Sequence, residues 1–79
     1  MYYINHSSMN VFVFKTSVEN MDQITHLAPV LDSLAGRGAW NFDLTDRDRI
    51  LRIVSDRVNP ETAMGLISSF GFACHELEG

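Results

Sequence analysis

Residues 40–54 read Trp-Asn-Phe-Asp-Leu-Thr-Asp-Arg-Asp-Arg-Ile-Leu-Arg-Ile-Val and have the pattern of a β-hairpin. In their first part Trp40, Phe42 and Leu44 alternate with polar residues, which predicts a strand with one buried face. Residues 45–48 are polar and predict the turn. Residues 50–54 are mostly apolar and predict the return strand.

A helix pattern lies on each side of this hairpin. Before it, an apolar stripe at spacings of three and four predicts a helix from about Val18, with Ser17 as a candidate N-cap and glycines 36 and 38 at its end. After it, Asn59-Pro60-Glu61 combines an N-cap residue, a proline at the first helical position and an acid. That second helix is expected to end at Gly71.

Residues 11–14 and 72–77 complete the order as the first and last strands. The sequence β-α-β-β-α-β predicts an α+β protein of the ferredoxin-like class, with a four-stranded antiparallel sheet in the order 4-1-3-2 and two helices on one face. A chain of 79 residues forms one domain. We assign residues 10–79 to it and treat residues 1–9 as an N-terminal extension of undefined structure, which could extend the first strand.

The sheet face that the helices leave open is predicted to carry apolar side chains. Placing Lys15 outward puts Val11 and Val13 on this face, and the third strand adds either Ile50 and Val54 or their apolar neighbours. Such a patch exceeds the usual scatter of apolar side chains on a surface. It predicts self-association, as a homodimer through the open face, unless Tyr2-Tyr3-Ile4 folds over it.

The layout resembles the heavy-metal-associated domain family. The likeness lies in Phe14-Lys-Thr16, in Gly38-Ala-Trp-Asn-Phe-Asp-Leu44 and in Gly71-Phe-Ala73. In that family, two cysteines in the loop between first strand and first helix bind a soft metal ion. The resemblance places Ser17 and Asn20 at these two positions. Because neither is a good ligand for a soft metal ion, we expect a degenerate metal site and no cofactor.

Other metal ligands are sparse. His26 lies on the first predicted helix, whereas Cys74 and His75 are neighbours on the last strand and therefore point to opposite faces. A divergent metal-binding or metal-trafficking domain that uses His, Met and Cys ligands stays open as an alternative. A small-molecule sensor of the ACT type is a second alternative.

Charge and composition exclude further functional classes of protein. Six basic residues against ten acidic ones give a net charge of −4, which argues against nucleic-acid binding. No apolar run is long enough for a membrane span, and no catalytic set of nucleophile and base is evident. A single cysteine and an unpatterned start suggest a cytoplasmic protein. We therefore expect a non-enzymatic cytoplasmic module that acts through protein contact.

Overall fold

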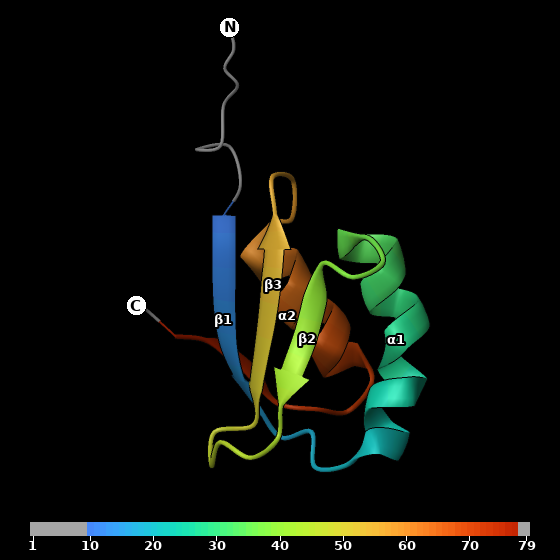
Figure 1. Ribbon diagram of the computed structural model, residues 1–79, viewed down its shortest axis with the longest axis vertical. Coiled ribbons are helices and arrows are strands. Elements are labelled where there is room, and N and C mark those ends of the chain that lie inside the picture. Colours follow the sequence, from blue (N-terminus) through green and yellow to red (C-terminus); the bar gives the residue numbers. More distant parts are fainter. Residues whose placement is uncertain (1–9, 78–79) are drawn as a thin grey trace, which may run out of the picture.

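The computed structural model describes residues 10–77 and contains four strands and two helices (Figure 1). The elements follow one another as β1 (Asn10–Thr16), α1 (Met21–Ala35), β2 (Trp40–Asp43), β3 (Ile50–Ser55), α2 (Pro60–Ser69) and β4 (Cys74–Glu76). This is the predicted order of elements. The extension at residues 1–9, with Tyr2-Tyr3-Ile4, lies outside the described residues.

The four strands form one antiparallel sheet in the order β2-β3-β1-β4. This is the predicted order 4-1-3-2 counted from the other edge, so the α+β class and the sheet topology are confirmed. The topology is consistent with a ferredoxin-like fold. The edge strands are shorter than predicted: β2 stops at Asp43, which leaves Leu44 in the turn, and β4 contains only three residues.

Both helices pack on the same face of the sheet, as Figure 1 shows for α2 behind β3. The sheet contributes Phe14, Leu51 and Ile53 to the core, and each is fully buried. This settles the side-chain alternation of the two central strands: Phe14 and Leu51 are paired in register and point toward the helices. From the helices, the core takes Leu27, Leu31, Ala63 and Ile67.

The first helix begins later than predicted, at Met21. Its N-cap is Asn20, whose side chain accepts a hydrogen bond of 2.9 Å from the amide of Gln23. Val18, which was expected to open the helix, is instead fully buried in the preceding loop. The helix runs through Pro29 and ends at Gly36, whose φ of 104° favours glycine.

The second helix agrees closely with its sequence pattern. Asn59 caps it by accepting hydrogen bonds from the amides of Glu61 and Thr62, and Pro60 occupies the first turn. Its C-cap is Phe70, and the next residue, Gly71, has a φ of 93°. The predicted glycine stop is therefore confirmed.

Candidate functional site

The sheet side turned away from the helices, which we call the open face, is organised in rows across the strands. Strand register defines these rows because residues directly opposite each other point to the same side. The first row contains Val11 and Val54, and the second contains Val13, Arg52 and Asn41. The third row runs His75, Lys15, Ile50, Asp43 from β4 to β2.

One end of the open face is apolar and exposed. Val11 is 60% exposed, and its cross-strand partner Val54 is 38% exposed. Leu77, which is 37% exposed, continues the alternation of β4, and its amide donates to the carbonyl of Val13. Of the five large apolar side chains exposed among residues 10–77, three therefore lie on the open face, Val11 and Val54 in its first row and Leu77 in its second. The other two belong to the helix layer.

Ile50 behaves differently from the other predicted interface residues. It lies on the open face between Lys15 and Asp43, yet it is only 6% exposed. It is also outside the core cluster on the helix side of the sheet. Ile50 therefore offers little surface to a partner, whereas Val11 and Val54 offer more.

The opposite end of the open face is charged. Lys15 lies 3.8 Å from a carboxylate oxygen of Asp48, and both groups are largely exposed. On the far strand, the Thr45 hydroxyl and amide donate to Asp43 and lower the pKa of its carboxyl, with a smaller contribution from Arg52. Asp43 therefore stays negatively charged at neutral pH. The charged row has a cationic side at Lys15 and an anionic side at Asp43.

The loop after β1, where the family resemblance places a metal site, is occupied by structural contacts. Ser17 exchanges two hydrogen bonds with Ala73, since its amide donates to the Ala73 carbonyl and its Oγ accepts from the Ala73 amide at 2.9 Å. The interpretation of Ser17 as a helix cap is therefore wrong, because its hydroxyl is used across the fold. The residue that caps the helix is Asn20, the other position that the resemblance assigns to a metal ligand.

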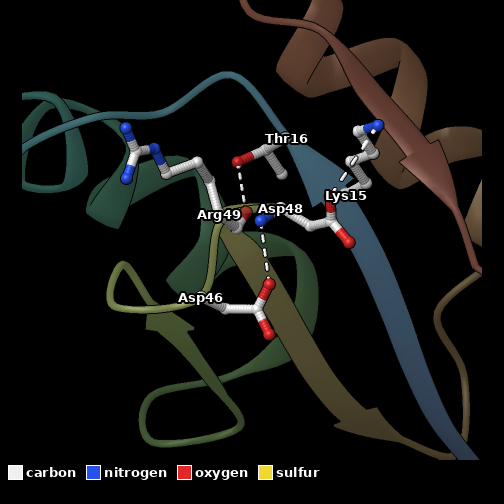
Figure 2. Close-up of polar contacts among 5 residues, drawn as sticks. All are labelled: Lys15, Thr16, Asp46, Asp48 and Arg49. Atoms are coloured by element: carbon white, nitrogen blue, oxygen red, sulfur yellow. Dashed lines mark hydrogen bonds and ion pairs between the residues drawn. The ribbon is translucent and has the colours of Figure 1, made fainter.

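Thr16 holds this loop against the β2–β3 turn (Figure 2). Its amide donates to the carbonyl of Asp48, and its hydroxyl donates to the carbonyl of Arg49 at 2.6 Å. Asp46 stabilises the turn from within by accepting from the Asp48 amide. The end of the sheet is thus closed by backbone and hydroxyl contacts.

The structure does not bring the three alternative metal ligands, His26, Cys74 and His75, together into one site. His26 packs edge-on against Phe70, with ring centroids 5.6 Å apart. Cys74 is buried, and burial raises the pKa of its thiol to about 11, so the thiolate that a metal needs is disfavoured. His75 is exposed on the open face. Within residues 10–77, no three His, Cys, Asp or Glu side chains are grouped to hold a metal ion.

A shallow groove of about 340 Å³ lies between the two helices. Val30, Ser33 and Leu34 line it from α1, and Leu66 lines it from α2. Its lining contains no charged group and no titratable cluster, so it offers no chemistry for catalysis.

Comparisons with known proteins give no assignment: no family model, curated protein or solved structure matches this chain. Among the described residues, no helix has the length and apolar character needed to cross a membrane.

The structure adds four residues to the open face that the sequence did not single out, namely Asn41, Asp43, Arg52 and Leu77. The signal for Arg52 was present, because it sits between Leu51 and Ile53 in a run where only one alternation places the arginine in solvent. Asp43 could have been placed the same way, from its alternation with Phe42. Leu77 lies just beyond β4 but within the predicted strand 72–77, so alternation from His75 places it on the same face.

Proposed function

We propose that this protein is a non-enzymatic, ferredoxin-like module that acts through protein contact and forms a homodimer through the open face. The observation that carries the proposal is the exposed pair of Val11 and Val54, which face each other across the two central strands. Central strands of a sheet normally present polar side chains where they meet water. Covering this pair with a second copy removes apolar surface from solvent and is favourable.

The degenerate loop supports a role without metal chemistry. Ser17 and Asn20 both use their side-chain oxygens for hydrogen bonds that hold the loop and cap α1. Neither side chain supplies a thiolate. The resemblance to the heavy-metal-associated domain is then one of layout, with the contact surface in place of the metal site as the functional part.

The area of the open face indicates how tightly two copies can bind. The four strands are 7, 4, 6 and 3 residues long. At about 3.4 Å per residue and about 4.8 Å between strands, they present a plane of roughly 330 Å². Side-chain relief increases this figure, yet it stays below the roughly 800 Å² that each partner buries in a standard-size complex. We therefore expect a reversible dimer with a dissociation constant in the micromolar range.

Sedimentation equilibrium from about 1 µM to 1 mM tests the proposal. The wild-type chain is expected to pass from monomer to dimer across this range. Val11→Asp should weaken the dimer at least about tenfold, because it places a charge in the apolar end of the interface. Met21→Asp is the matched control, since Met21 is 66% exposed but lies on α1.

A wild-type chain that stays monomeric throughout, or a Val11→Asp variant that associates as well as Met21→Asp, would rule the proposal out. At about 1 µM, where the wild-type chain is expected to be monomeric, both variants should retain the wild-type thermal unfolding curve, because each replaces a side chain that is mostly in solvent.

A further inference from the structure

The open face has unequal ends, and this asymmetry restricts how two copies can meet. Its apolar row holds Val11 and Val54, and its charged row lies two residues along each strand beyond the row of Arg52. Sheets that pack face to face keep their strands aligned to within about 30°. A two-fold dimer of this sheet therefore has two arrangements, with the strands of the two copies antiparallel or parallel.

The antiparallel arrangement places unlike rows on each other. With the two-fold axis across the strands, each strand faces its own copy, so Arg52 meets Arg52 of the partner subunit. The charged row with Lys15 and Asp43 then covers the apolar row with Val11. Like charges in contact and charges buried against apolar groups both cost free energy.

The parallel arrangement matches like rows and opposite charges. With the axis along the strands, between β1 and β3, β1 of one copy covers β3 of the other. Val11 then meets Val54 of the partner subunit. Arg52 meets the partner's Val13, so this arrangement also sets one cation per copy against an apolar side chain, but it brings no like charges together. At the charged end, β2 covers β4, so Asp43 faces the partner's His75 with the partner's Lys15 beside it.

Resting on the function proposed above, we infer that two copies dock with parallel strands, and that Asp43 of each copy pairs with the Lys15 and His75 row of the other. The two-fold axis produces this contact twice. The apolar row supplies the area that is removed from water, and the two charge contacts select the orientation. Lys15 lies 3.8 Å from Asp48 of its own chain, so the partner's Asp43 shares this cation with Asp48.

Charge reversal tests this orientation directly. In Asp43→Lys, both contacts become repulsive, because a cation introduced at this position in one copy would face Lys15 of the other. In Lys15→Glu, both contacts become repulsive with the opposite sign, because the introduced anion would face Asp43. Each variant alone is expected to associate at least about tenfold more weakly than the wild-type chain.

Mixing the two variants in equal amounts is the decisive measurement. In the mixed dimer, the cation introduced by Asp43→Lys faces the anion introduced by Lys15→Glu, and the unchanged Asp43 of one chain faces the unchanged Lys15 of the other. Both contacts are attractive again, so the mixture should recover association to within a few-fold of the wild-type chain. Sedimentation with one variant labelled identifies the mixed dimer.

Controls separate this inference from the proposed function. Asp22→Lys makes the same change of charge on α1, away from the open face, and should associate like the wild-type chain. Asp43→Asn keeps an acceptor for Thr45 and separates loss of charge from loss of the turn contact. If the wild-type chain dimerises and Val11→Asp disrupts it, but mixing restores nothing, the face is right and the parallel orientation is wrong. If the wild-type chain is monomeric, the proposed function itself fails.

Discussion

The hydroxyl of Thr16 donates a hydrogen bond of 2.6 Å to the carbonyl oxygen of Arg49, which lies 33 residues further along the chain (Figure 2). The same hydroxyl oxygen accepts a bond of 3.2 Å from the amide of Val18. Thr16 is only 6% exposed. One buried side chain thus satisfies backbone groups of two loops and fixes the β2–β3 turn against the end of β1.

Replacing Thr16 with valine should lower the free energy of unfolding by about 1–3 kcal/mol, because the Arg49 carbonyl and the Val18 amide lose their partner inside the protein. Urea denaturation followed by the fluorescence of Trp40, the single tryptophan, measures this change. Thr16→Ser keeps the hydroxyl and should recover most of the loss. Equal stability of the valine and serine variants would show that the hydrogen bonds contribute little.

The contact between Trp40 and Asp32 should contribute to the attachment of α1 to the edge of the sheet. The indole nitrogen donates to the Asp32 carboxylate at 2.8 Å, and both residues are half-buried. We expect Asp32→Ala to cost about 1–2 kcal/mol of unfolding free energy, since a hydrogen bond to a charged acceptor is lost. Asp32→Asn retains an acceptor and should cost less. An alanine variant no less stable than the asparagine variant would contradict this role.

Cys74 should make the protein less stable in alkali. Burial raises the pKa of its thiol from 9.0 to about 11, so the folded state holds its proton where the unfolded state has released it. This loss of stability is absent at neutral pH and begins as the pH passes 9.0, the pKa of the thiol in the unfolded chain. It grows until the pH reaches about 11, the pKa of the thiol in the folded protein. At pH ~10 it should amount to about 1.4 kcal/mol of lost stability.

Comparing Cys74→Ala with the wild-type chain isolates this effect. The alanine variant is expected to be less stable at pH ~7, because it leaves a small cavity, but to lose less stability between pH ~7 and pH ~10. Denaturation curves at the two pH values give the difference. Parallel losses in both proteins would exclude Cys74 as the cause.

Signals from residues adjacent in sequence were sufficient to predict most of the fold. Asn59 and Pro60 fixed the start of α2 because capping and proline geometry involve only neighbouring residues. The start of α1 was misplaced for the opposite reason. The Ser17 hydroxyl bonds to Ala73, 56 residues away, and no local pattern can indicate that partner.

The open face was predictable in outline and not in detail. The position of Val11 followed from the phase of β1. In β3, an outward Arg52 places Leu51 toward the helices and Ile50 on the open face, but it does not indicate how far Ile50 is exposed there. Ile50 lies between Lys15 and Asp43 of two other strands and is only 6% exposed, which no local pattern indicates. Such coverage is a property of the assembled sheet.

The central position of β1 has a consequence for synthesis of the chain. Both strands that pair with β1 are made after it, since β3 begins at Ile50 and β4 at Cys74. At about 5–20 residues per second, the apolar run of β1 waits on the order of several seconds on the ribosome before its first partner strand exists. During that interval the nascent chain exposes a strand with high β propensity, and its capture by a chaperone competes with aggregation between neighbouring chains.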